Sequence, residues 1–484
     1  MEKQKNSENL LPTVFVIFGA TGDLTRQKLV PALFHLYREG QLPRMFQVVG
    51  FARKNLSDSE FQELVSKIVR EKIKDAGERD IETFSKYFVY QQGLFEDRGG
   101  YKKLAERLGH KDGEWKVCAN KLFHLAVPPQ YYRELLRELK RSGLTKPCSP
   151  KEGWTRVLVE KPFGKDFDTA QELDKLLGKL FQEEQIYRID HYLGKETVQN
   201  VLAFRFSNSF LTPAWNNVGI DKIQVRLLEK KDIEGRAGFY EGIGALRDVG
   251  QNHVLQLLAL FLMNNPGTFD ADSIREERAK VFESLKSFST KDVEKATIRG
   301  QYRGYRDEDD VSPRSDTETY FHIKIQSNDR KWKGIPLYIE GGKGLSESKV
   351  EVIVTFRHPI QCLCPGNAKE HYKNVLRYSV QPQEGAKISF WVKKPGGEMK
   401  LEEKEFSFDY KEAFEGQEIS DAYERLIGNV LKGDQTLFVS TREIMAEWKF
   451  VDQILSHWQK GKSRLILYDR GSKQITDKGF KEEE

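Results

Sequence analysis

The sequence predicts two domains: an N-terminal α/β domain (residues 1–187) with a doubly wound parallel sheet, and a C-terminal β+α domain (188–484) with a large antiparallel sheet. Three observations lead to this prediction. A chain of 484 residues exceeds the size of one ordinary core. In its first part, apolar strand-like runs alternate with helical stretches, as in a parallel sheet with helical crossovers. The region after Gly219 instead carries polar-alternating strands without regular helices between them, which indicates a half-exposed antiparallel sheet.

Composition excludes several classes of protein. The 78 basic and 73 acidic residues leave a formal charge of +5, without the clustered basicity of a nucleic-acid-binding protein. Residues 1–9 contain no apolar signal-peptide core, and the longest apolar run, Val254 to Met263, is too short to cross a bilayer. We therefore expect a cytoplasmic protein with no nucleic-acid or membrane partner.

The first strand leads into a glycine turn. The run Thr13 to Phe18 is apolar and β-rich, and the spacing of apolar residues from Thr25 to Tyr37 predicts a helix. A strand, glycine turn and helix together can cradle a pyrophosphate, because the backbone approaches closely and the helix N-terminus offers free amides. The pattern is GxxGDL rather than GxGxxG, so an ordinary turn is an equal alternative. The candidate cofactor residues are Gly19, Ala20, Thr21, Gly22, Asp23 and Leu24, with Lys28 as a cleft or surface lysine.

Two strand ends indicate the cofactor and its neighbour. The strand 46–52 ends in Arg53, and an arginine there suits a 2′-phosphate, which favours NADP over NAD; the alternative is a solvated charge. The strand 154–159 delivers Lys161 before Pro162. This lysine is held in extended geometry before a bond that can be cis, and we expect its ammonium to point into the crevice. A surface lysine before a simple turn is the alternative.

Two later segments carry dense polar chemistry. Residues 187–196 pack two acids, three bases and two phenols around one glycine, and we expect them to hold an anionic substrate. Further on, His253 opens a nearly all-apolar helical run. It is either a satisfied structural histidine or, with an aspartate from elsewhere in the chain, a general base.

The four cysteines form no disulfide framework. His358, Cys362, Cys364 and His371 could in principle bind zinc, but their spacing matches no standard arrangement. We expect free thiols and no metal.

Five motifs resemble those of the glucose-6-phosphate dehydrogenase family: GATGDL at 19–24, EKPFG at 160–164, RIDHYLGKE at 188–196, RDVGQNH at 247–253 and DAYERLI at 421–427. The resemblance covers nearly the whole chain. It implies an N-terminal Rossmann-like domain and a C-terminal β+α domain, with a homodimer or homotetramer formed through the large sheet. It also implies NADP-dependent oxidation of glucose 6-phosphate to 6-phosphogluconolactone, the first step of the pentose phosphate pathway.

The resemblance also assigns roles to residues. His253 is similar to the family's general base and Asp190 to its orienting carboxylate. Lys161 would bridge substrate and nicotinamide, with Pro162 cis, and Arg53 would meet the 2′-phosphate. Lys343 matches the lysine of an RxGK motif whose arginine is absent here, and Ser348 replaces a second cation. The remaining expected substrate residues are His191, Tyr192 and Lys195 for the phosphate, and Glu229 and Asp248 for sugar hydroxyls.

Two alternatives stay open at this point. One is a related oxidoreductase of an unphosphorylated hexose, although a neutral sugar needs no cluster such as His191, Tyr192 and Lys195. The other is an NADP-binding regulator without activity, which the presence of both Asp190 and His253 disfavours.

Overall fold

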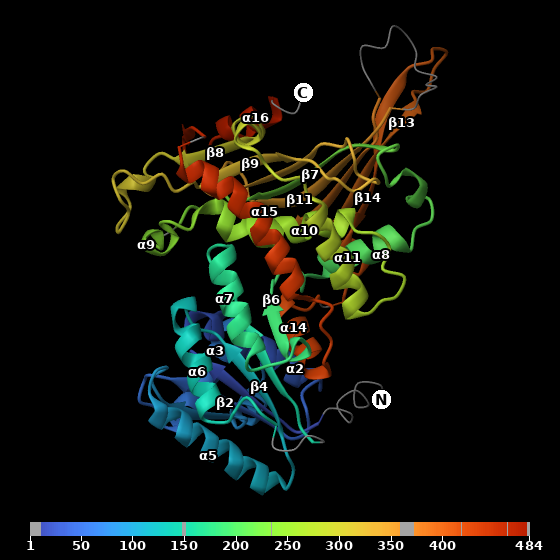
Figure 1. Cartoon of the computed structure of the whole chain (residues 1–484). Helices are drawn as coiled ribbons and strands as arrows, with labels where there is room; N and C mark the ends of the chain where they lie inside the picture. Colours follow the sequence, from blue (N-terminus) through green and yellow to red (C-terminus); the bar gives the residue numbers. More distant parts are fainter. Residues whose placement is uncertain are drawn as a thin grey trace. The chain divides into compact units, whose positions relative to one another are not determined.

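The computed structural model describes residues 11–147, 152–233, 235–358, 372–417, 419–461 and 463–481. The chain forms two compact units (Figure 1). Unit 1 runs to Lys195 and also takes 270–272 and 420–444, and unit 2 contains the rest. The boundary expected at 187/188 falls inside strand β6 (Ile186–Ile189). Because a strand stays with its sheet, the division follows Lys195, where the chain turns into helix α8 (Glu196–Phe206).

Unit 1 contains a seven-stranded sheet in the order β15-β6-β5-β4-β1-β2-β3. All its strand pairs are parallel except β15 with β6. Every residue of β1, β2 and β4 is buried, as expected for central strands covered on both faces. The further strands are β1 (Thr13–Phe18), β2 (Phe46–Ala52), β3 (Phe88–Gln92), β4 (Asn120–Leu125), β5 (Thr155–Val159) and β15 (Phe438–Val439).

The connections run outward from β1 in one direction and from β4 in the other. Right-handed crossovers would put α2 and α3 on one face of the sheet and α6 and α7 on the other, and α2 indeed contacts α3 while α6 contacts α7. The strand order reverses between β1 and β4, and ligands of such sheets bind at this point, outside the carboxyl ends of the strands. Among the described residues, the helices of four residues or more that lie wholly in unit 1 are η1 (Thr25–Leu29), α2 (Val30–Arg38), α3 (Asp58–Lys72), α4 (Glu78–Ser85), α5 (Arg98–Trp115), α6 (Tyr132–Arg141), α7 (Phe167–Gly178) and α14 (Ala422–Lys432).

Unit 2 contains a nine-stranded sheet in the order β14-β13-β12-β11-β7-β10-β9-β8-β16. It is mostly antiparallel, and the parallel pairs β10–β7 and β16–β8 depart from the expected pattern. The strands are β7 (Ile220–Leu228), β8 (Thr297–Tyr302), β9 (Tyr320–Ile325), β10 (Leu337–Gly342), β11 (Lys349–Phe356), β12 (Val375–Gln381), β13 (Gly385–Lys393), β14 (Leu401–Asp409) and β16 (Leu465–Tyr468).

A helical segment packs on β7 and β10 of this sheet. It begins as a π-helix, η5 (Leu246–Val254), and continues as α10 (Leu255–Leu262), in which all residues are buried. The expectation that His253 opens the helix is wrong, because the helix begins seven residues earlier. The other helices of four residues or more that lie wholly or partly in unit 2 are α8, α9 (Ala237–Tyr240), α11 (Ala271–Ser284), α12 (Thr290–Ala296), α13 (Tyr410–Ala413), α15 (Thr441–Gln459) and α16 (Gln474–Lys481).

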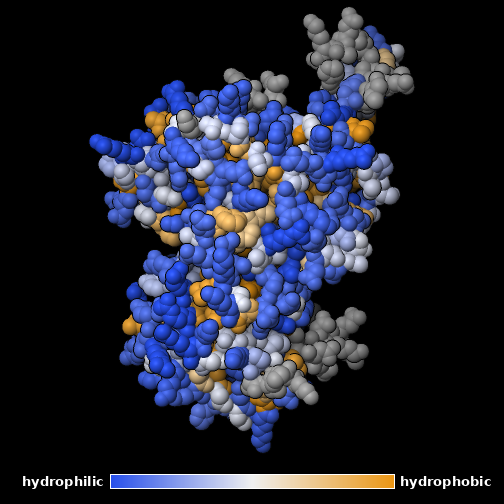
Figure 2. Space-filling view, in the orientation of Figure 1, coloured by the Kyte–Doolittle hydropathy of each residue, from blue (hydrophilic) through white to orange (hydrophobic). Residues whose placement is uncertain are grey.

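The predicted fold class is confirmed: a parallel-sheet domain followed by a domain with a large, mostly antiparallel sheet. In the described residues no helix is long and apolar enough to span a membrane. The face drawn in Figure 2 is predominantly hydrophilic.

The prediction of free thiols is wrong at Cys118, which is disulfide-bonded. The other three cysteines lie outside the described residues, as does His371 of the candidate zinc ligands.

Candidate active site

The glycine turn after β1 is built for close backbone approach. Gly19 has a φ of +86°, and a Cβ there would lie 2.3 Å from the carbonyl oxygen of Ala126, just beyond β4. Its own carbonyl accepts the Gly22 amide at 2.9 Å and the Thr25 hydroxyl at 3.3 Å. The turn therefore fits tightly at the reversal point between β1 and β4, where the pyrophosphate of a dinucleotide is expected.

The helix after this turn opens as the π-helix η1. Leu24 occupies its N-cap and makes no side-chain capping bond. Ala20 is buried, Thr21 and Leu24 are half-buried, and Gly22 and Asp23 are exposed. An N-terminus without a side-chain cap, next to exposed turn residues, fits an anionic cofactor group.

Two basic residues predicted for the cofactor lie in different settings. Lys28, in η1, forms an ion pair of 2.9 Å with Asp421, the N-cap of α14. Burial opposes ionisation of Asp421, but Lys28 and the Tyr423 amide lower the pKa of this carboxyl below its usual value. Lys28 is thus tied to α14, whereas Arg53 lies exposed at the end of β2.

The EKPFG turn follows β5. The Lys161–Pro162 peptide is cis, as predicted. Lys161 is half-buried, and the preceding Glu160 accepts from His124 at 2.9 Å. His124 was missed in the sequence; its signal was a polar residue in the middle of an apolar strand.

The polar stretch after β6 forms a compact turn. Asp190 is buried, with 1% of its surface exposed, and its Oδ1 accepts the Tyr192 amide at 3.0 Å. The Lys195 ammonium lies 4.2 Å from the centre of the Tyr192 ring, and the His191 and Tyr192 rings are 4.9 Å apart. Unit 1 therefore gathers the three residues predicted to hold phosphate.

This turn is fixed from both sides. Arg188, buried in β6, forms ion pairs with Asp174 at 2.7 Å and with Glu183 at 2.8 Å. Both carboxylates that balance its charge belong to unit 1. A Cβ on Gly194 would lie 2.8 Å from the Ala422 carbonyl oxygen, and Arg425 donates to the Gly194 carbonyl at 2.8 Å. Helix α14 thus packs directly on the turn.

In unit 2, three predicted substrate residues come together. The Lys343 ammonium lies 2.5 Å from Glu229 and 3.1 Å from Asp248. Lys343 follows β10, Glu229 follows β7, and Asp248 lies in η5. Burial disfavours the charged form of Lys343, but Asp248 and Glu229 outweigh burial and raise its pKa. We call Glu229, Asp248 and Lys343 the Lys343 cluster; its two acceptors and one donor suit sugar hydroxyls.

Glu340 stands at the position where the RxGK motif has its arginine. In the parallel register of β10 with β7, Glu340 lies beside Arg226, and the two form an ion pair of 2.6 Å. Ser348, in place of a second cation, accepts the Lys230 amide at 2.9 Å. The guanidinium of Arg226, on the neighbouring strand β7, therefore lies next to the position of the missing arginine.

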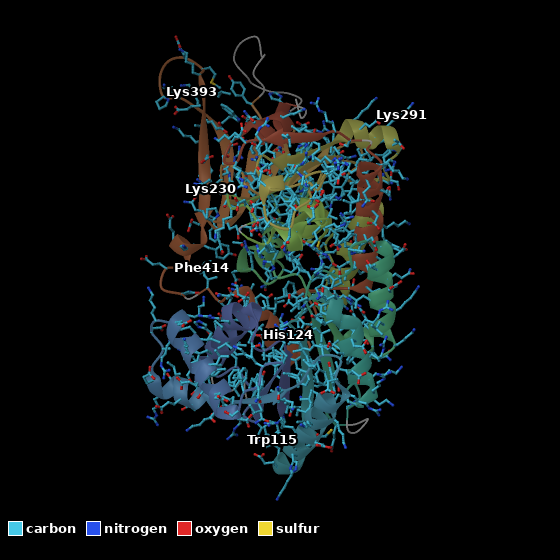
Figure 3. All side chains as sticks on the ribbon, turned by 90° about the vertical axis from the view of Figure 1, so that its left-hand side faces the viewer. Trp115, His124, Lys230, Lys291, Lys393 and Phe414 are labelled. Atoms are coloured by element: carbon cyan, nitrogen blue, oxygen red, sulfur yellow. The ribbon has the colours of Figure 1, made fainter. Side chains whose placement is uncertain are left out.

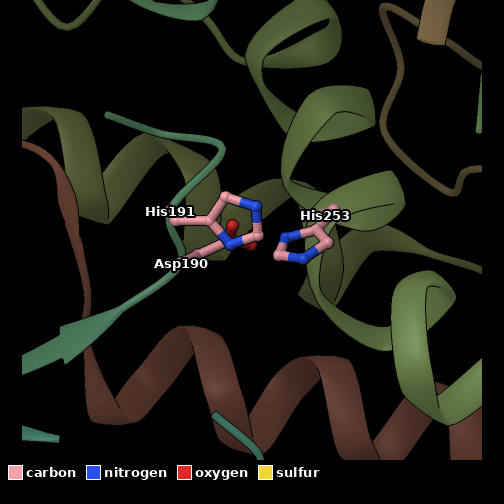
Figure 4. Close-up of side chains that lie close together, drawn as sticks. All are labelled: Asp190, His191 and His253. Carbon is pink, nitrogen blue, oxygen red and sulfur yellow. The ribbon is translucent and has the colours of Figure 1, made fainter. Parts of the chain in front are cut away.

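His253 lies in η5 and is buried, with 1% of its surface exposed. Figure 4 shows the helix that carries His253 and the turn after β6 that carries Asp190 and His191. In a π-helix residues five apart lie on nearly the same side, so Asp248 and His253 share a side of η5. The first residue of η5 is held by Glu318, whose Oε1 accepts the Leu246 amide at 3.1 Å; sequence reasoning missed this glutamate.

Comparison with known proteins identifies the family. Residues 16–200 match the model of the NAD-binding domain of glucose-6-phosphate dehydrogenase, and residues 202–478 match the model of its C-terminal domain. A glucose-6-phosphate 1-dehydrogenase of Aggregatibacter actinomycetemcomitans is 40% identical over 94% of this chain and 93% of its own. One of Rhizobium meliloti is 37% identical over 95% of this chain and 94% of its own.

Solved structures agree. A glucose-6-phosphate dehydrogenase in complex with its substrate glucose 6-phosphate matches with a TM-score of 0.88 and 34% identity, covering 96% of both chains. A glucose-6-phosphate 1-dehydrogenase from Mycobacterium avium has a TM-score of 0.80, with 29% identity and 95% of both chains covered. The chain belongs to the glucose-6-phosphate dehydrogenase family of oxidoreductases, as the five motifs predict.

Proposed function

We propose that this chain oxidises D-glucose 6-phosphate at C1 to 6-phospho-D-glucono-1,5-lactone, with NADP+ as the hydride acceptor. The observation that carries the proposal is the Lys343 cluster. It places two carboxylates and an ammonium together, with one of the carboxylates on the same side of η5 as His253. Such a group binds a polyhydroxylated ligand next to a base.

The substrate phosphate binds His191, Tyr192 and Lys195. Charge-assisted hydrogen bonds from such groups to a phosphate dianion contribute roughly 1.5–3 kcal/mol each. A neutral hexose offers no negative charge to this cationic group, so the phosphorylated sugar is preferred.

His253 removes the proton from the C1 hydroxyl as hydride leaves the carbon. An imidazole ordinarily titrates near 6.5 and is therefore suited to accept a proton at neutral pH. Asp190 fixes the tautomer of His253 and stabilises the imidazolium, in the way a carboxylate does in hydrolytic triads. With both groups present, an inactive regulator is the weaker alternative.

The other site residues position the reactants. Glu229 and Asp248 accept hydrogen bonds from sugar hydroxyls, and Lys343 donates. Lys161 bridges the substrate and nicotinamide sides, and Arg53 pairs with the 2′-phosphate. The turn residues Gly19 to Leu24 and Lys28 would hold the pyrophosphate side of the cofactor. When bound, NADP+ supplies the hydride acceptor.

The chain is further proposed to form a homodimer or homotetramer through the C-terminal sheet. Strand β14 is the edge of that sheet, and it and β13 expose large apolar side chains: Phe390, Val392, Phe406 and Phe408. Exposed apolar groups on an edge strand favour association with another sheet. A second copy of the chain would cover them. The cytoplasmic location stays a prediction.

Replacing His253 by Asn tests the reaction directly. Turnover should fall by roughly 10²–10⁴-fold, the contribution typical of a general base, while the KM for glucose 6-phosphate changes little. H322N is a matched control, since His322 is a buried histidine on β9 of the same unit. Near-normal turnover of H253N would remove His253 as the base.

A further inference from the structure

Glu160 is held at both ends, directly before Lys161. Its carboxylate Oε1 accepts from His124 Nε2 at 2.9 Å and from the Tyr423 hydroxyl at 3.2 Å. Its backbone carbonyl accepts the Tyr132 hydroxyl at 2.9 Å. We call His124, Tyr132, Glu160 and Tyr423 the Glu160 cluster. Three donors on one residue leave the backbone entering Lys161 little freedom.

The donor from the sheet is costly to bury. His124, labelled in Figure 3, lies in β4, the middle strand of the sheet of unit 1, with none of its surface exposed. Its ring stacks on that of Phe15. The other side chains of β4 around it include Leu122, Phe123 and Leu125. A buried imidazole is tolerated where it makes a hydrogen bond, and Glu160 provides that partner.

The second donor comes from far along the chain. Tyr423 lies in the first turn of α14, and burial raises its pKa well above the usual value, so it stays a hydroxyl donor. The same helix end pairs Asp421 with Lys28 and donates from Arg425 to the Gly194 carbonyl. One turn of α14 therefore contacts three segments assigned to the site: η1, the EKPFG turn and the turn after β6.

We propose that Glu160 is a positioning residue for Lys161, and that His124 and Tyr423 hold it in place. The inference rests on the proposed function, because it assumes that Lys161 contacts substrate or cofactor. It goes beyond that function by giving Glu160, His124 and the DAYERLI segment a role in the reaction without contact to the reacting atoms.

A double-mutant cycle tests this proposal. E160A should lower kcat/KM by roughly ten- to hundredfold, the loss that follows when a reacting group is displaced by about 1 Å. K161A should lower it at least as much, and E160A/K161A should be no worse than K161A alone. E160Q should restore most of the activity, since its amide oxygen still accepts from His124 and Tyr423. A merely structural glutamate would instead give additive losses in the cycle.

Y423F removes one hydroxyl and keeps the ring. We expect a loss of kcat/KM of roughly tenfold, smaller than that of E160A, that disappears in the K161A background. Y101F is the matched control: Tyr101 is a buried tyrosine of unit 1 whose hydroxyl donates to the Phe95 carbonyl at 2.8 Å, outside the Glu160 cluster. Its kcat/KM should equal that of the parent protein.

The outcomes separate the two proposals. If K161A is as active as the parent protein, the role assigned to Lys161 is wrong and the inference falls with it. If K161A is impaired but E160A and Y423F lower its kcat/KM further, Lys161 keeps its role and the positioning inference is overturned. Full activity of E160A also overturns the inference.

Discussion

Glu318 offers a test of how the helix carrying His253 is held. The side chain is buried, with 5% exposed, and its Oε1 accepts the amide of Leu246, the first residue of η5. Its carbonyl accepts the Ala245 amide at 2.9 Å. Burial raises the pKa of the Glu318 carboxyl from 4.5 to about 7, against the lowering effect of the backbone amides of Glu318 and Leu246. The substitution that isolates this effect is E318Q, which keeps the shape and the amide-accepting oxygen but cannot ionise.

The direction in which pH changes the free energy of unfolding follows from proton linkage. A carboxyl with a raised folded-state pKa binds its proton more tightly when folded, so its favourable contribution is complete below about pH 4.5 and is lost as pH rises to about 7. A rise from 4.5 to about 7 corresponds to roughly 3 kcal/mol of unfolding free energy. The stability of E318Q relative to the parent protein should therefore increase by roughly that amount between about pH 5 and about pH 8.

Denaturant unfolding of both proteins across this pH range measures the difference. E63Q serves as the control, because the Glu63 side chain is 79% exposed and its substitution should give a difference that is small at every pH. A difference between E318Q and the parent protein that does not change with pH would refute the assignment of a raised pKa to Glu318.

Three further predictions concern the cofactor, the substrate and assembly. R53A should raise the KM for NADP far more than the KM for NAD, and equal effects would contradict contact with the 2′-phosphate. K343M leaves Glu229 and Asp248 without their cation; steady-state kinetics should show the KM for glucose 6-phosphate raised by roughly tenfold or more, and an unchanged value would exclude the Lys343 cluster from binding. F406E places a charge on a phenylalanine that is 67% exposed on β14; light scattering should show a smaller assembly than for the parent protein, and an unchanged mass would argue against this surface.

Local patterns in the sequence predicted much of the fold. The alternation of strands and helices gave the parallel sheet, and the glycine turn was expected where Gly19 now has a positive φ. The cis bond before Pro162 was also expected. These features depend on a few neighbouring residues, so the sequence contains the information that specifies them.

Contacts between distant segments were not predictable in this way. Lys28 and Asp421 are separated by 393 positions, and Tyr423 and Glu160 by 263. Helix α14 belongs to unit 1 although the chain has passed through most of unit 2 before reaching it. No local pattern encodes such a return, and the boundary placed at 187/188 therefore ignored it.

The π-helix was missed for a different reason. Periodicity distinguishes helices from strands but does not separate a π-helix from an α-helix over nine residues. The apolar run after His253 was visible, whereas the helical turns before it contain Arg247, Asp248 and Gly250 and were not assigned to the helix. Sequence reasoning assigned Glu229, Asp248 and Lys343 one by one, and their mutual ion pairs emerged only in three dimensions.

The most direct test of the central claim is an absorbance assay of reduced nicotinamide that crosses NADP and NAD with glucose and glucose 6-phosphate. Our account predicts rapid reduction with glucose 6-phosphate and NADP, slower reduction with NAD, and little with unphosphorylated glucose. Equal rates with glucose and glucose 6-phosphate would contradict the phosphate-binding role of His191, Tyr192 and Lys195. The absence of reduction in all four combinations would contradict the proposed dehydrogenase activity itself.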